Sequence, residues 1–255
     1  MKLKFICLNL YEGGLLFDNI IDFLNVEDPD IIAFQEVNNG VDPNLPNYLR
    51  TMQVLSENLP AYHHFFSPEM LMRYPEGKIN IGNALFSKFP ITNQQTVFLN
   101  VPYGEYDSVP IGGDFSKHPK NMQCCEILVE DQIVTVCNLH GIWGLNGIDN
   151  EDRLKMSALI VEQVKDKSKV ILAGDFNLKP NTQTIMNIEA YLTNIFKDEL
   201  DTTFNLSRKD LDRFPGYATA VVDMIFTSQD LVVTKHTCPN RDVSDHLPLL
   251  IEIDL

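Results

Sequence analysis

The sequence contains little basic charge. Its 255 residues include 20 Lys and Arg against 35 Asp and Glu, and the formal net charge is -15 at pH 7. Surfaces that grip nucleic acid need many cationic side chains, because much of their affinity comes from counterion release at the phosphates. The composition therefore argues against a broad nucleic-acid-binding surface. It still allows a nucleic-acid substrate, since a local basic strip or bound metal ions can serve instead.

Long apolar runs and cysteine motifs are also missing. No apolar stretch is long enough to span a bilayer. The opening MKLKFICLNL is short, is interrupted by Asn9 and lacks a small-residue cleavage site, so it is interpreted as a first strand. The five cysteines are odd in number and show no Cys-x-x-Cys spacing, which favours a reduced interior. We therefore expect a cytoplasmic protein without stable membrane association.

The chain is long enough for one domain with a full core. Apolar residues make up 44% of it, and 255 residues lie near the upper size for a single domain. The sequence has no internal repeat, low-complexity tract or linker-like change in composition. We expect residues 1–255 to form a single domain.

Strand-like and helix-like patterns alternate along the chain. Short apolar, β-branched runs predict strands near residues 2–10, 30–37, 82–91, 125–130, 133–140, 169–177, 221–228, 231–237 and 246–255. Helical spacing predicts helices over 17–28, 47–58, 150–166 and 182–192. Two stretches rich in Pro, Gly, Tyr and His, residues 61–80 and 100–121, are expected to be surface loops.

Two of these patterns predict more detail. In the helix over 150–166, Leu154, Ala158, Val161 and Val164 would share the buried face, with Asp149 or Asn150 as the N-cap. Residues 125–140 predict a β-hairpin that turns at Asp131 and Gln132. Mixed strands and helices, several joined by hairpins, indicate an α/β or α+β sandwich.

Polar residues follow or begin most of the predicted strands. Each one alone has an ordinary explanation, such as an Asx turn, a solvated strand edge or a core histidine. Asp175 and Asn177 would project to the same side of their strand end, because strand residues alternate faces. The set comprises Asn9, Gln35, Glu36, Asn138, His140, Asp175, Asn177, Asp223, Ser244, Asp245 and His246.

The set has a common chemical logic. Carboxylate and amide oxygens without cysteine are the ligands of a hard cation such as Mg²⁺ or Mn²⁺. Two histidines, each near an aspartate, can transfer protons and neutralise charge. Phosphoester hydrolysis needs this combination, because positioning alone supplies only about 7–11 kcal/mol of the barrier reduction.

In chain order, Asn9, FQEV, GNALFSKFPI, NLH, AGDFN, VDMIF and SDHLP resemble the motifs of the endonuclease/exonuclease/phosphatase superfamily, whose members include DNase I. The resemblance runs from residue 3 to 253, and the ordered set is far more specific than any single motif. It implies a four-layer, DNase I-like fold, with two mixed β-sheets packed face to face between helices. The site would lie at one end of this sandwich.

The resemblance also implies a role for each motif residue. Glu36 would be the principal Mg²⁺ or Mn²⁺ ligand, with Asn9 and Asp245 completing or supporting the metal shell. Asp175 would orient or deprotonate the attacking water. Asn177 would be its partner and would hydrogen-bond a phosphoryl oxygen.

The histidines take the remaining roles in this resemblance. His246 would contact the scissile phosphate, and Asp223 would fix its tautomer. His140 would steady the pentavalent phosphorus or assist the leaving group, which places the chain with the histidine-bearing branch. Arg153 is a further candidate for phosphate binding, with a surface ion pair to Asp149 or Asp152 as the alternative.

These inferences predict a Mg²⁺- or Mn²⁺-dependent phosphodiesterase, most plausibly a nuclease. A phospholipid or small phosphometabolite hydrolase is the alternative, and the acidic charge is compatible with it. A binding module that has lost activity is less favoured, since every expected acid, amide and histidine is present. Residues 102–121 would form part of the rim, where Tyr103, Tyr106 and Phe115 either stack bases or pack the loop down. Glu12 could enlarge the acidic site, although an ordinary loop acid is the simpler interpretation.

Overall fold

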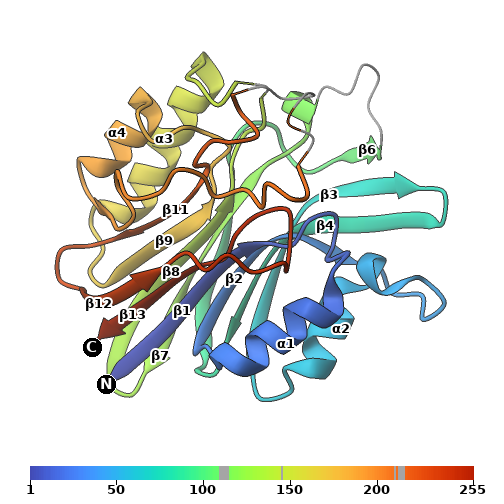
Figure 1. The fold of residues 1–255 in the computed structure, drawn as a ribbon, viewed down its shortest axis with the longest axis horizontal. Coiled ribbons are helices and arrows are strands. Elements are labelled where there is room, and N and C mark those ends of the chain that lie inside the picture. Colours follow the sequence, from blue (N-terminus) through green and yellow to red (C-terminus); the bar gives the residue numbers. More distant parts are fainter. Residues whose placement is uncertain (109–114, 145, 210, 212–215) are drawn as a thin grey trace.

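The computed structural model describes residues 1–108, 115–144, 146–209, 211 and 216–255. They form two β-sheets stacked face to face, with helices on both outer sides (Figure 1). In spatial order the first sheet contains β12 (Val232–Thr237), β13 (Leu249–Asp254), β1 (Lys2–Asn9), β2 (Ile31–Asn39), β4 (Gly77–Ser87), β3 (His63–Tyr74) and β6 (Glu105–Asp107). The second contains β10 (Thr193–Asn194), β11 (Asp223–Thr227), β9 (Val170–Asp175), β8 (Gln132–His140), β7 (Asn121–Val129) and β5 (Ile91–Phe98).

Both sheets are mixed, so the predicted four-layer sandwich is confirmed. In the first sheet β1 runs parallel to β2 and antiparallel to β13. In the second sheet β8 runs parallel to β9, and β9 runs antiparallel to β11. The carboxyl ends of β1 and β2, and those of β8 and β9, carry the polar motif residues. Figure 1 shows both termini at the opposite, lower-left end of the sandwich.

Three apolar clusters hold the layers together. Phe5, Val134 and Ile251 belong to the cluster between the two sheets. Helices α1 (Phe17–Glu27) and α2 (Thr51–Asn58) cover the first sheet through the second cluster. Helices α3 (Glu151–Val164) and α4 (Gln183–Glu189) cover the second sheet through the third. Each sheet thus packs against the other sheet on one face and against helices on the other. Two 3-10 turns, η1 (Asn47–Leu49) and η3 (Phe115–Lys117), lie in the connections.

Helix α3 begins as predicted but buries a different face. Asn150 is its N-cap and accepts a hydrogen bond from the Arg153 backbone N–H, whereas Asp149 instead accepts from the first turn of α4. Met156, Ile160 and Val164 face the core. The predicted face was right for Val164 but wrong for Leu154, which is 38% exposed, and for Ala158, which is also exposed. The helix carries two apolar stripes, and the one spaced by four residues packs against the sheet.

The expectation of a surface loop over residues 61–80 was also wrong. This segment forms most of a long hairpin, β3 and β4, which projects beyond the rest of the sandwich on the right of Figure 1. Pro68 is tolerated because the register shifts between Pro68 and Met70. In the second expected loop, β6 pairs with β3, and residues 109–114 lie outside the described part of the chain. The hairpin of β7 and β8 turns at Glu130 and Asp131, one residue earlier than predicted.

The cysteines correct another expectation. Cys124 on β7 lies directly opposite Cys137 on β8, and the two form a disulfide. Cys7 and Cys125 are free and buried, and Cys238 is free and partly exposed. The interior is therefore not fully reduced, because strand pairing brought together two cysteines that no sequence motif connects. Within the described residues, no helix is both long enough and apolar enough to cross a membrane.

Candidate active site

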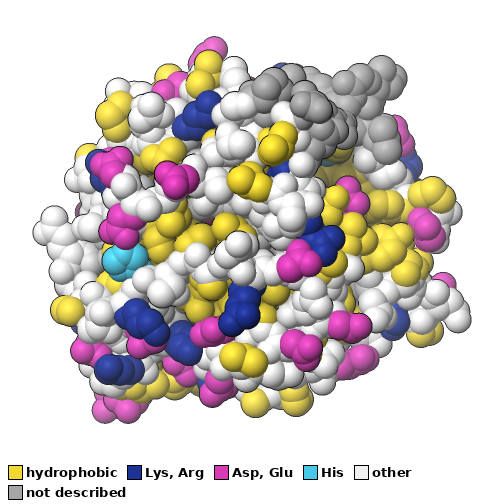
Figure 2. Space-filling model, in the orientation of Figure 1, with side chains coloured by type: hydrophobic (Ala, Val, Ile, Leu, Met, Phe, Trp, Pro, Cys, Tyr) yellow, Lys and Arg dark blue, Asp and Glu magenta, His cyan; other side chains and the backbone are white. Residues whose placement is uncertain are grey.

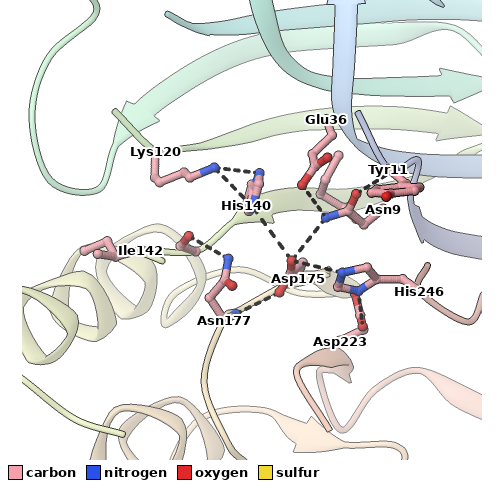
Figure 3. A network of polar contacts seen from close by, with 12 residues as sticks. Asn9, Tyr11, Glu36, Lys120, His140, Ile142, Asp175, Asn177, Asp223 and His246 are labelled. Carbon is pink, nitrogen blue, oxygen red and sulfur yellow. Dashed lines mark hydrogen bonds and ion pairs between the residues drawn. The ribbon is translucent and has the colours of Figure 1, made fainter. Parts of the chain in front are cut away.

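A pocket of about 440 Å³ opens where the polar strand ends meet. Asn9 and Asp223 lie directly behind its lining, hydrogen-bonded to Asp175 and to His246 respectively. The structure therefore brings together the predicted site residues with the exception of Arg153. Figure 3 labels all of them except Asp245. The predicted residues that line the pocket are Glu36, His140, Asp175, Asn177, Asp245 and His246.

Three of the predicted site residues, Asp175, His140 and Asp223, form a row across the second sheet. Asp175 at the end of β9 is in register with His140 on β8 and with Asp223 on β11. Gly174 allows this close alignment, because a Cβ at that position would lie 2.0 Å from the Leu139 carbonyl oxygen. The row places two carboxylates and an imidazole on neighbouring strands, as the AGDFN, NLH and VDMIF motifs require.

Asp175 is the central carboxylate of the pocket. Its side chain accepts hydrogen bonds from the Asn177 backbone N–H at 2.8 Å and from the Asn9 side-chain amide at 3.1 Å. It is only 2% exposed. Burial and the neighbouring Asp223 raise its pKa to about 6, although His246 opposes the shift. A carboxylate with this pKa is ionised at neutral pH and can accept a proton.

The His246 imidazole lies between the carboxylates of Asp175 and Asp223. Its Nδ1 lies 2.8 Å from Asp223 Oδ2, which leaves Nε2 directed toward the pocket, 4.0 Å from Asp175 Oδ2. The Phe204 ring packs edge-on against the imidazole, with centroids 4.6 Å apart. Burial alone would lower the His246 pKa, but Asp223 and Asp245 outweigh it and raise the pKa to about 9. The imidazole therefore carries a proton at neutral pH.

His140 has the opposite electrostatic environment. Its Nε2 lies 3.7 Å from Asp175 Oδ2, while Lys120 Nζ lies 2.9 Å from its Nδ1. Burial, Lys120 and His246 lower its pKa well below the usual value. Glu69, 3.4 Å from Lys120, is fully buried, and burial raises its pKa to about 7 despite the lysine. His140 is therefore neutral where His246 is cationic.

Glu36 is placed by an irregularity in β2. The register with β4 shifts between Phe34 and Val37, and Glu36 has a φ of 57°. This left-handed conformation is costly for a residue with a Cβ. It turns the carboxylate into the pocket, where it accepts hydrogen bonds from the Glu12 backbone N–H at 2.7 Å and from Asn9 at 3.2 Å. The strain is maintained at the residue for which we predict metal binding.

The acidic residues near Glu36 fit a hard cation. Glu12 and Asp245 also line the pocket, and burial together with Glu36 and Asp245 raises the pKa of Glu12. Lys209 already forms an ion pair with Asp245. These oxygen donors, without cysteine, match the preference of Mg²⁺ or Mn²⁺. Glu12 is therefore an exposed loop acid that also lines the pocket.

Asn9 has a clearer supporting role than a ligand role. Its side-chain oxygen accepts the Tyr11 backbone N–H at 3.0 Å, and its amide nitrogen donates to Glu36 and Asp175. The amide thus links the two carboxylates. Asp175, Asp223 and His246 form a buried group whose donor atoms lie within 4.8 Å of one another and could hold a metal ion. In that group Asp223 and His246 already bond each other, and among the acids near Glu36, Asp245 is already paired with Lys209.

Arg153 does not line the pocket, and its predicted phosphate contact is not supported by its position. The side chain is 1% exposed. Its guanidinium donates to the carbonyl oxygens of Ile142, Ile148 and Asn177 at 2.5–3.1 Å. Burial lowers the pKa of Arg153. The alternative, an ion pair with Asp149 or Asp152 on the helix surface, does not fit a side chain that is buried. Arg153 instead holds the Asn177 turn against the loop that follows β8.

Asn177 points its amide into the pocket from a strained turn. Its φ is 54°, its Nδ2 donates to the Gly141 carbonyl at 3.2 Å, and its Oδ1 accepts the Tyr217 hydroxyl. The amide nitrogen has a second N–H available for a phosphoryl oxygen. This orientation is consistent with the predicted role.

Four functional candidates were missed in the sequence. Lys120 and Glu69 flank His140, Tyr217 orients Asn177, and Lys209 pairs with Asp245. None follows a strand with a characteristic motif, and Glu69 lies in a segment expected to be a loop. Conversely, two strand-end residues of the predicted polar set, Gln35 and Asn138, are fully buried and hydrogen-bond each other between the sheets.

Comparisons find known proteins that are similar to this chain in sequence or in fold. A protein of Acanthamoeba polyphaga mimivirus is 27% identical over 274 residues, covering 95% of this chain and 92% of the viral protein. A mannosyl-6-phosphatase from Bacteroides thetaiotaomicron superposes with a TM-score of 0.72 at 21% identity, covering 99% of this chain and 100% of that one.

A third comparison matches the fold at lower identity. D. rerio TDP2, in complex with a single-strand DNA product, superposes with a TM-score of 0.70 at 15% identity and covers 100% of this chain and 99% of that one. The model of the endonuclease/exonuclease/phosphatase family matches residues 8–246, which span the first and last strand-end motifs. That match takes in the whole pocket from Asn9 to His246, and the chain therefore belongs to the endonuclease/exonuclease/phosphatase family of phosphoester hydrolases.

Proposed function

We propose that this protein is a Mg²⁺- or Mn²⁺-dependent phosphodiesterase in which water attacks phosphorus in line. One observation carries the proposal. Asp175, with a pKa near 6, lies between a cationic imidazole and a neutral one, with Nε2 atoms 4.0 Å and 3.7 Å from the same carboxylate oxygen. A general base, a proton donor and a neutral imidazole thus converge on one point, as attack on a charged phosphoester demands.

Each side chain has a role in this scheme. Asp175 accepts the proton of the attacking water, while Asn177 donates its second N–H to a phosphoryl oxygen. His246 donates from Nε2 to the scissile phosphate, and Asp223 keeps the proton on Nδ1. His140 contacts the phosphorane or the leaving group as a neutral imidazole. Lys120 adds positive charge at the same end of the pocket.

The metal would be held mainly by Glu36, with Glu12 and Asp245 close by. A divalent cation there supplies charge neutralisation and polarisation of a phosphoryl oxygen. Asn9 keeps the Glu36 and Asp175 carboxylates in place through its two N–H groups.

Nucleic acid is the substrate class we propose first. Aromatic side chains that line the pocket, including Tyr11, Tyr48 and Trp143, can stack on bases. A small phosphoester is the second candidate. The described pocket lining contains five carboxylates and two lysines, which disfavours an extended contact with many phosphates.

The test uses hydrolysis of bis(p-nitrophenyl) phosphate with Mg²⁺ or Mn²⁺ and with EDTA. We expect metal-dependent turnover, which Asp175→Asn reduces by about 10²- to 10⁴-fold. Asp152→Asn, on the exposed face of α3, is the matched control and should retain full activity. Full activity of Asp175→Asn, or equal turnover in EDTA, would contradict the proposal. Short DNA, RNA and phospholipid assayed with the same preparation then rank the substrate classes.

A further inference from the structure

The pocket continues away from the catalytic residues along the projecting β3–β4 hairpin. Met70, Met72 and Tyr74 alternate along β3 and therefore share one face. Ile81 on β4 pairs with Met70. All four line the same pocket as Asp175, and we call them the hairpin arm. Figure 2 shows hydrophobic side chains gathered over this hairpin.

The hairpin arm is not part of the apolar core that holds the layers together. Met70 and Met72 are only 3% and 5% exposed, yet neither belongs to the core clusters formed by the described residues. Their exposed edges face the pocket. Phe115 and Trp143, in edge-to-face contact at 5.6 Å, add aromatic lining. Apolar side chains that line a pocket beside catalytic groups are typical of a substrate subsite.

Charge limits what the hairpin arm can accept. The lysines among the described lining are Lys120 and Lys209, and each already has a carboxylate partner. The cationic His246 lies beside Asp175 and is paired with Asp223. The arm itself contains no cationic side chain. A second phosphate placed there would lose water without gaining a counter-charge. An uncharged group would instead gain from contact with the methionines and the tyrosine.

We propose that the hairpin arm binds an uncharged ring group, of the size of a nucleobase, joined to the scissile phosphate. The proposal rests on the proposed phosphodiesterase activity and specifies its substrate. A pocket of about 440 Å³ is within the usual range for one small ligand. The substrate then carries a single phosphodiester charge and ends in the arm. This favours a terminal residue or a small diester over the interior of a long strand.

The first experiment compares diesters that share a p-nitrophenol leaving group. Their second ester group is methyl, cyclohexylmethyl, thymidine through its 5′ oxygen, or the same thymidine with a 3′-phosphate. We expect kcat/KM for the thymidine ester to exceed that of the methyl ester by about 10- to 100-fold, from burial of one ring. The added 3′-phosphate should remove most of this preference.

The outcomes separate the sources of the ring. A preference for both the cyclohexylmethyl and thymidine esters supports recognition of any apolar ring, and a preference for thymidine alone supports a nucleobase. Equal kcat/KM for the methyl and thymidine esters would overturn the inference while leaving the phosphodiesterase proposal intact. Absence of metal-dependent turnover on every ester would instead defeat the proposed function on which the inference rests.

Substitutions in the arm give an independent readout. Met72→Ala and Ile81→Ala should each lower the thymidine-to-methyl ratio of kcat/KM by about threefold to tenfold, because each removes apolar contact with the ring. Ile81 is partly exposed, so its variant provides the measurement if Met72→Ala does not fold. Met186→Ala, 45% exposed on α4, is the control and should keep the wild-type ratio. An unchanged ratio in both folded arm variants would contradict the inference.

Discussion

The two histidines of the pocket lie on opposite sides of Asp175 and are equally buried, each 5% exposed. The pKa of His246 is nevertheless raised to about 9, whereas that of His140 is lowered well below its usual value. Burial lowers both values, so it cannot explain the difference. The partners explain it: His246 meets the carboxylate of Asp223, and His140 meets the ammonium group of Lys120.

The comparison shows how one pocket can hold a proton donor and a neutral imidazole at the same pH. A cationic His246 can donate a hydrogen bond to a phosphoryl oxygen. A neutral His140 keeps a ring-nitrogen lone pair that can accept a proton. With Asp175 ionised above a pKa of about 6 and His246 protonated below about 9, activity should follow a bell-shaped pH profile.

Replacing the cationic member of the pair should have the largest effect. His246→Gln removes the charge beside the scissile phosphate, and we expect kcat to fall by about 10²- to 10⁴-fold. Steady-state hydrolysis of bis(p-nitrophenyl) phosphate measures the loss. The control is His63→Gln, at an exposed position that begins β3. A loss below threefold for His246→Gln would contradict the assignment of His246 as the cationic proton donor that distinguishes it from His140.

Removing the partner of His246 should have an intermediate effect. Asp223→Asn takes away the largest charge that offsets burial, so the His246 pKa should fall below about 9, although Asp245 and Asp175 still raise it. A smaller share of the imidazole is then protonated at pH 8, which predicts a partial loss of activity, smaller than that of His246→Gln. The alkaline limb of the pH–rate profile should move to lower pH, while Asp254→Asn leaves it in place.

The smallest loss of activity is expected from removing the partner of the neutral His140. Lys120→Met removes the ammonium group next to His140, so the pKa of His140 should rise, although burial keeps it low. The pKa of Glu69 should rise above about 7, because the lysine lowers it. Activity should fall less than tenfold. An NMR titration of the two imidazoles, with Lys155→Met as the surface control, should show an upward shift in the pKa of His140 alone. An unchanged His140 pKa would show that burial lowers it without help from Lys120.

The strand-end motifs were informative because the side chains of a strand alternate between its two faces, so the residues that project together at a strand end can be read from the sequence. The step from Asp175 to Asn177, the SDH segment and the order of the motifs follow from the sequence, and the structure places them in one pocket. Arg153 was misassigned because a guanidinium that binds phosphate and one that binds carbonyl oxygens look the same in sequence. Glu69 and Lys120 were missed because their partners come from strands far apart in the chain.

The sequence by itself determined the layered α/β architecture, since hydrophobic periodicity can be read along the chain. It also determined the chemical character of the site, since the polar residues at the strand ends are given directly by the sequence. Tertiary structure alone decided the charge of each histidine, the turning of Glu36 into the pocket and the apolar arm beside Asp175. These properties depend on which side chains meet across the two sheets, and electrostatic and packing energies are set by distances in space.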